Sequence, residues 1–174
     1  MQEYPFRAIG GSFGIDDGQN VSVLGLLLGA LTTREAALLL IDGIYLMTAS
    51  PTAVTGVGVQ MNVRRLSALS SGTAGVVSLL NRQHKEAQAF LADHVTCATG
   101  GTTTAIDTLG YRLVNNDEAS LTGQADIVER AIWKPARPDS PLVLNRGEGV
   151  DLFQITASTA GAWNPEIAGR LVLQ

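Results

Sequence analysis

The sequence is poor in cysteine and in charged residues, and each shortage excludes a class of site. Its 174 residues contain one cysteine, Cys97, so neither an internal disulfide nor a zinc site built from several thiolates can form. Charged residues make up 16% of the chain, the net charge is −4, and the only adjacent basic residues are Arg64 and Arg65. Because nucleic-acid binding depends on clustered Lys and Arg that neutralise phosphates, we expect no direct contact with nucleic acid.

A long apolar run is also missing. The longest covers residues 21–31 and is interrupted by Ser22, Gly25 and Gly29. Since a helix that crosses a bilayer needs about 20 apolar residues, we expect no membrane span. No basic segment precedes this run, so we expect no signal peptide and assembly in the cytoplasm.

Apolar residues, in contrast, are abundant. They make up 45% of the chain, and the mean hydropathy is +0.18. A soluble monomer needs a charged surface, which this composition supplies poorly. We therefore expect neighbouring copies to cover part of the surface, in a homo-oligomer.

The clearest local pattern is the alternation in residues 57–69. Val57, Val59, Met61 and Val63 alternate with glycine or polar residues, which predicts a strand with one buried face. Other short β-prone segments, separated by turn residues, cover residues 36–49, 74–80, 95–104, 111–114, 126–134, 142–144, 150–158 and 167–173. Eight or nine short strands at this spacing predict a single all-β domain over residues 21–174, a jelly-roll-like β-sandwich.

Two segments leave the type of element open. Residues 21–31 fit a buried strand or a short helix. In residues 36–49, the pair Asp42-Gly43 fits either a hairpin turn or a bulge within one strand.

One segment has helical rather than strand spacing. In residues 81–93, Ala87, Phe90 and Leu91 lie on one side of a helix and Lys85 and Glu86 on the other. The sequence therefore predicts one short helix in a loop between strands.

Residues 1–20 contain four glycines and few apolar residues, which predicts an extended N-terminal arm. The arm could pack on its own domain, but the low surface charge favours packing on a neighbouring subunit. We therefore expect Tyr4, Phe6 and Phe13, together with Trp163 near a later turn, to lie at a subunit interface. A chain lacking residues 1–15 is then expected to fold but to assemble poorly.

The candidate catalytic and metal-binding residues are too few to form a site. His84 and His94 are ten residues apart, about 80° from sharing one face of a helix. No serine lies in a nucleophile elbow, and Cys97 fits a buried structural thiol. We therefore expect no catalysis, no bound metal and no cofactor.

Two segments carry a resemblance to known proteins. Residues 63–74 read VRRLSALSSGTA and residues 141–150 read PLVLNRGEGV. They resemble patterns in small phage structural proteins, where a strand ending RRxSAxxxGT precedes a polar loop and a PLVLxxGEG turn leads into the last strands. The resemblance covers roughly residues 36–174.

This resemblance implies a β-sandwich component of a virion. The expected role is a coat subunit or a capsid-stabilising decoration protein that packs against copies of itself and other virion proteins. Its expected location is the virion, after assembly in the host cytoplasm. A carbohydrate- or receptor-binding β-sandwich of a phage tail or fibre remains the alternative.

Overall fold

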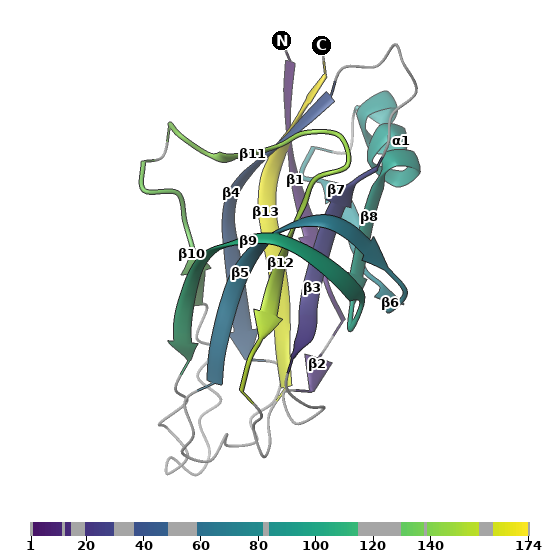
Figure 1. Cartoon of the computed structure of the whole chain (residues 1–174). Helices are drawn as coiled ribbons and strands as arrows, with labels where there is room; N and C mark the ends of the chain where they lie inside the picture. Colours follow the sequence, from purple (N-terminus) through teal and green to yellow (C-terminus); the bar gives the residue numbers. More distant parts are fainter. Residues whose placement is uncertain are drawn as a thin grey trace, which may run out of the picture.

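The chain folds as two facing antiparallel β-sheets with one short helix (Figure 1). The computed structural model describes residues 2–11, 13–14, 20–29, 37–48, 59–81, 84–114, 130–137, 139–156 and 162–173. The prediction of an all-β sandwich is confirmed.

Sheet A has seven strands, five of them in the order β10-β4-β13-β1-β7. Their bounds are β10 (Arg130–Trp133), β4 (Ala37–Thr48), β13 (Ala162–Leu173), β1 (Gln2–Ile9) and β7 (Val76–Leu79). The short strands β11 (Leu142–Leu144) and β2 (Phe13–Gly14) pair with β4 and β13 respectively.

Sheet B has six strands in the order β6-β8-β3-β12-β5-β9. Their bounds are β6 (Thr73–Ala74), β8 (Val95–Thr99), β3 (Val21–Leu28), β12 (Gly149–Gln154), β5 (Val59–Ser70) and β9 (Thr102–Val114). Residues 21–31, which fitted a strand or a helix, thus contribute a strand.

The strand order is that of a jelly roll. Within sheet A the strands β1, β13, β4 and β10 are consecutive neighbours, and within sheet B so are β3, β12, β5 and β9. Taken along the chain, these eight strands give the two interlocked Greek keys that define this fold. The segment from β6 to β8 is inserted between β5 and β9 and adds strands to both sheets on one side.

The core lies between the sheets and follows the predicted alternation. In β5 the side chains of Val59, Met61 and Val63 are buried. Within the predicted segment 36–49, the described residues 37–48 form one bulged strand, because Gly43 pairs with Ala168 while the next pair joins Ile41 to Gly169. This bulge keeps apolar side chains on the inner face on both sides of Asp42; the buried ones are Ala37, Leu39, Ile41, Ile44 and Leu46.

The helix α1 (Lys85–His94) lies beside β7 and β8 (Figure 1). Ala87 and Leu91 are its buried residues, at the i and i+4 spacing of one face. The predicted helix over residues 81–93 is therefore present, but it begins at Lys85 after a His84 that makes no side-chain cap.

The interpretation of residues 2–9 as part of an arm is wrong. They form β1, which pairs with β13 along its whole length and with β7 from Phe6 to Ile9. Phe6 and Ala8 point into the core and are completely buried. Tyr4, Phe6 and Ala8 lie on one face of β1, as on a half-buried strand. Burying their apolar side chains in their own domain offsets the entropy lost when the segment is ordered.

Candidate functional site

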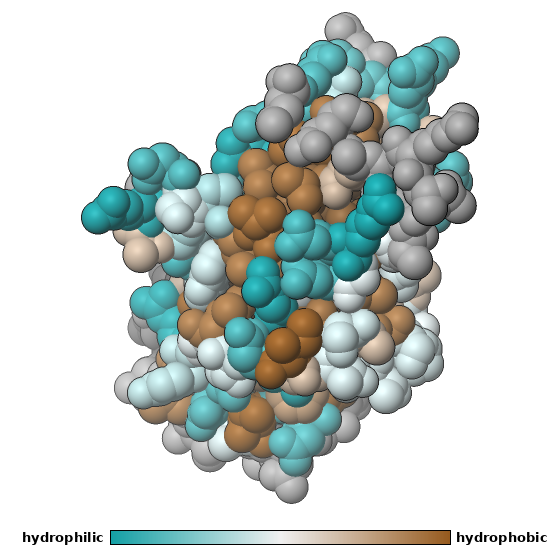
Figure 2. Space-filling view, turned by 45° about the horizontal axis from the view of Figure 1, so that its top comes forward, coloured by the Kyte–Doolittle hydropathy of each residue, from teal (hydrophilic) through white to brown (hydrophobic). Residues whose placement is uncertain are grey.

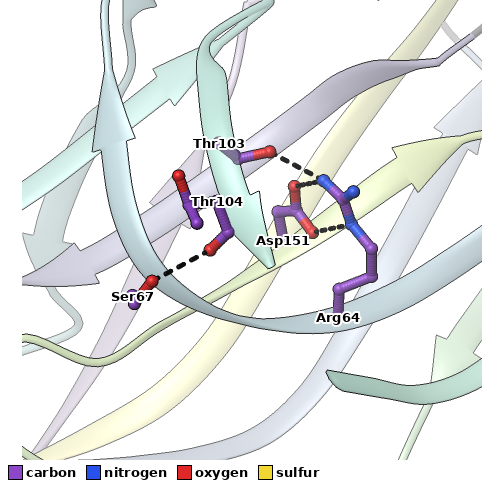
Figure 3. Close-up of polar contacts among 5 residues, drawn as sticks. All are labelled: Arg64, Ser67, Thr103, Thr104 and Asp151. Carbon is purple, nitrogen blue, oxygen red and sulfur yellow. Dashed lines mark hydrogen bonds and ion pairs between the residues drawn. The ribbon is translucent and has the colours of Figure 1, made fainter. Parts of the chain in front are cut away.

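The most developed polar cluster centres on Arg64 of β5 and Asp151 of β12 (Figure 3). The two residues are directly opposite each other in the sheet. Arg64 donates from Nε to Asp151 Oδ1 at 3.0 Å and from Nη2 to Oδ2 at 2.6 Å. This bidentate pair is the strongest arrangement available to a guanidinium and a carboxylate.

The pair is shielded from water by its surroundings. The Asp151 side chain is fully buried and that of Arg64 is 13% exposed. Arg64 Nη2 also donates to Thr103 Oγ1 of β9 at 2.7 Å, and its guanidinium carbon lies 3.3 Å from the centre of the Phe153 ring. Strands β5, β12 and β9 are thus linked through one side chain.

The curvature of β5 and β9 brings these groups together. Both strands bend across the front of sheet B, over β12 and β3 (Figure 1). Register shifts at three places along their pairing are consistent with this bend. Leu66 and Leu69 of β5 are buried outside the main core cluster.

The chemistry of this cluster favours a structural role. Both oxygens of Asp151 accept hydrogen bonds from Arg64, so the carboxylate is engaged in holding the guanidinium in place. The pair therefore holds β9 on β5 and β12. Sequence reasoning missed it, because the alternation in residues 57–69 predicted a strand with only one buried face.

A second polar group forms a turn between β11 and β12. Glu148 Oε2 accepts from the backbone N–H of Asn145 at 2.8 Å and from its side-chain Nδ2 at 3.0 Å. These bonds lower the pKa of Glu148, chiefly through the Asn145 backbone N–H, with Arg65 adding a smaller electrostatic effect. The turn at residues 145–149 is thus held by the carboxylate of Glu148.

The expected interface residues lie in different environments. Tyr4 is partly buried and meets His84 edge to face, with ring centres 4.9 Å apart. Phe6 is completely buried in its own chain, so its assignment to a subunit interface is wrong. The backbones of Phe13 and Trp163 pair between β2 and β13, while their side chains lie outside the described part of the structure.

Tyr4 and His84 also line a small pocket of about 220 Å³ beside β1. Glu3, Pro5, Leu79 and Asn81 complete its wall. Glu3 is engaged by Arg170, whose Nη1 lies 2.7 Å from Glu3 Oε2, so this carboxylate already has a cation.

The remaining candidate ligands do not gather. His94 contacts the ring of Phe90, with centres 4.7 Å apart, and His84 contacts Tyr4. Cys97 is buried, and burial raises the pKa of its thiol to about 12. Within the described ranges, no three His, Cys, Asp or Glu side chains lie close enough together to hold a metal ion.

Exposed apolar side chains gather on the outer strands of the two sheets. For the residues that the structure describes, the large exposed hydrophobic ones are Ile9, Val76, Leu80, Ile106, Tyr111, Leu113 and Val143. Strands β7 and β9 end their sheets, and among the strands that the structure describes β11 pairs only with β4. Figure 2 shows groups of hydrophobic residues exposed on a surface that is otherwise largely hydrophilic.

Three comparisons with known proteins gave no match: no family model, no curated protein and no solved structure is similar to this chain. Among the described helical residues, none belongs to a helix long and apolar enough to cross a membrane.

Proposed function

We propose that the chain is a structural subunit of a virion, either a coat subunit or a decoration protein, that acts by packing against copies of itself. The observation that carries this proposal is where the exposed apolar residues lie. Ile106, Tyr111 and Leu113 are all on β9, with exposed fractions of 54%, 76% and 63%. Val76, on β7, is 64% exposed.

The two edges lie on opposite sides of the sandwich. Strand β9 shares its side with β10, and β7 shares its side with β8. A subunit with an apolar edge on each side can contact two neighbours at once, as an extended shell requires. Unprotected apolar edges on a free monomer would instead promote aggregation.

The composition and the sequence resemblance also support a structural subunit. A charge content of 16% leaves little to keep such edges in solution. The phage-like segments at residues 63–74 and 141–150 fall in β5, the following turn and the β11–β12 connection. The two segments therefore belong to the strands and turns of the sandwich itself. This supports a structural protein, without assigning it to one virion layer.

One observation favours the alternative of a glycan- or receptor-binding protein. Tyr111 is 76% exposed and lies opposite Asn62, so an aromatic ring and an amide share one face. Sugar-binding surfaces use such pairs. A glycan array would support this alternative if it gave a signal that Tyr111→Ala abolishes and Val76→Ala leaves intact.

The proposed function is tested by the oligomeric state of the full chain. We expect light scattering to show concentration-dependent oligomers and electron microscopy of the purified protein, or of its source particle, to show ordered assemblies. A stable monomer at hundreds of micromolar, with no assemblies on the grid, would contradict the proposal.

A further inference from the structure

We propose that β9 pairs antiparallel with β9 of a second copy, so that sheet B continues across a twofold axis into the neighbouring molecule. This inference rests on the proposed function, because it names the partner of one apolar edge.

The free edge of β9 has the properties of a pairing strand. It is 13 residues long and, within the described structure, pairs only with β5. None of its described side chains is buried. It contains neither proline nor lysine, the residues that most often protect an edge strand from pairing.

The register with β5 shows which face of sheet B each β9 residue occupies. Arg112 lies opposite Met61, whose side chain is in the core, and Tyr111 lies opposite the outward Asn62. Leu109 is skipped between the pairs Val63–Gly110 and Arg64–Thr108. This bulge reverses the alternation.

The bulge brings opposite charges onto one face. Because side chains alternate on either side of the bulge at Leu109, Asp107 shares the inner face of sheet B with Arg112. Thr108 likewise shares the outer face with Tyr111. Side chains directly opposite in an antiparallel pair must occupy the same face. These residues can therefore face each other in two copies of β9.

One register satisfies all of these pairs at once. If the twofold axis passes between Leu109 and Gly110, Asp107 of each copy faces Arg112 of the other. Thr108 then faces Tyr111, and Ile106 faces Leu113, each twice. Opposite charges and paired apolar side chains directly across an antiparallel ladder stabilise it.

This self-complementarity favours a second copy over an unrelated partner. A twofold contact uses the same patch on both molecules, so a strand that satisfies itself needs no other surface. Arg112 donates from Nη1 to the carbonyl oxygen of Ala131, and a guanidinium has four further N–H groups with which Arg112 can bind Asp107. Within the described structure, no strand pairing joins β9 to β10.

Disulfide cross-linking tests the register directly. Thr108→Cys and Tyr111→Cys are made separately in the full chain carrying Cys97→Ala. The proposed register places each new cysteine about 4.5–5.5 Å, between Cα atoms, from its counterpart in the other variant, within disulfide range. Within one variant the cysteines lie about 10 Å apart across the axis, which is too far.

We therefore expect the mixture of the two variants to form covalent dimers at least tenfold faster than either variant alone. Val76→Cys mixed with Thr108→Cys serves as the matched control, because it is also exposed and on an edge strand; it should give no excess dimer. A faster reaction of Tyr111→Cys with itself would overturn the register.

The outcomes separate this inference from the proposed function. If the wild-type chain is oligomeric and no β9 cysteine pair cross-links, the β9 pairing is wrong and the structural role stands. If the wild-type chain is monomeric at hundreds of micromolar, the proposed function fails and the pairing fails with it. Hydrogen exchange of the unmodified chain gives a check without variants: β9 amides should exchange at least tenfold faster on dilution to monomer.

Discussion

Arg64 and Asp151 are 87 positions apart in the sequence, yet they face each other across neighbouring strands and share two hydrogen bonds. Because Asp151 is fully buried, the guanidinium is what makes its charge tolerable there. The same guanidinium reaches Thr103 of β9, so the pair connects the centre of sheet B to its edge.

Replacing Arg64 with methionine should lower the free energy of unfolding by about 3–5 kcal/mol, because it leaves a buried carboxylate without its cation. Urea denaturation at pH 7 measures this loss. Arg65→Met is the matched control: its ion pair with Glu148 joins side chains that are 28% and 25% exposed, so the loss should stay below about 1 kcal/mol.

The double variant Arg64→Met with Asp151→Leu separates charge from packing. Removing both charges should recover most of the stability, since a buried ion pair and an apolar replacement are often equivalent. A double variant as unstable as Arg64→Met alone would show that the pair acts through shape and not through charge.

Phe6→Ala should destabilise the domain by about 3–5 kcal/mol, because Phe6 is completely buried in β1, which lies between β13 and β7 in sheet A. Thermal or urea unfolding measures the change. Ile9→Ala, in the same strand but 39% exposed, should cost much less. By the same argument a chain lacking residues 1–15 should fail to fold; a folded truncated domain would contradict the role of β1.

The elements that sequence predicted well are those with a local signal. Period-two alternation identified β5, and i, i+4 spacing identified α1. In β1, Tyr4, Phe6 and Ala8 carry the same alternation, but the glycines that follow Ile9 and the sparse apolar residues favoured an arm. Pro5 is tolerated in β1 because β1 pairs with β7 only from Phe6 onward, where every residue has a backbone N–H to donate.

The candidate sites could be predicted less well, because they depend on contacts between distant residues. No local pattern joins Arg64 to Asp151, since their pairing follows from the order β12-β5 within the sheet. The exposed edge at β9 likewise depends on which strand ends sheet B. A Thr-rich segment reads as β-prone whether its strand is central or at an edge.

Val59→Asp should lower the free energy of unfolding by about 3–5 kcal/mol, because Val59 is buried and a carboxylate there would have no partner. Gln60→Asp is the matched control, since Gln60 is partly exposed on the opposite face of the same strand. Circular dichroism during urea unfolding measures both. A Val59→Asp protein with wild-type stability would contradict the register of β5.

Cys97 should make the protein less stable as the pH rises above 9. Burial raises the pKa of its thiol from 9.0 to about 12. Below pH 9 the folded and unfolded chains both hold the proton. Between pH 9 and 12 only the unfolded chain releases it, so the free energy of unfolding should fall by about 1.4 kcal/mol per pH unit.

The control is Cys97→Ala, which lacks the titrating thiol and should lose less stability over the same pH range. The difference in pH dependence between the two proteins reports the thiol alone, because every other ionisable side chain is present in both. At pH 8 the native thiol should react with a soluble disulfide reagent at least a hundredfold more slowly than the unfolded one, since the thiolate is the reactive form. Equal pH slopes in the two proteins, together with rapid labelling of the native chain, would show that the thiol is accessible and ionises normally.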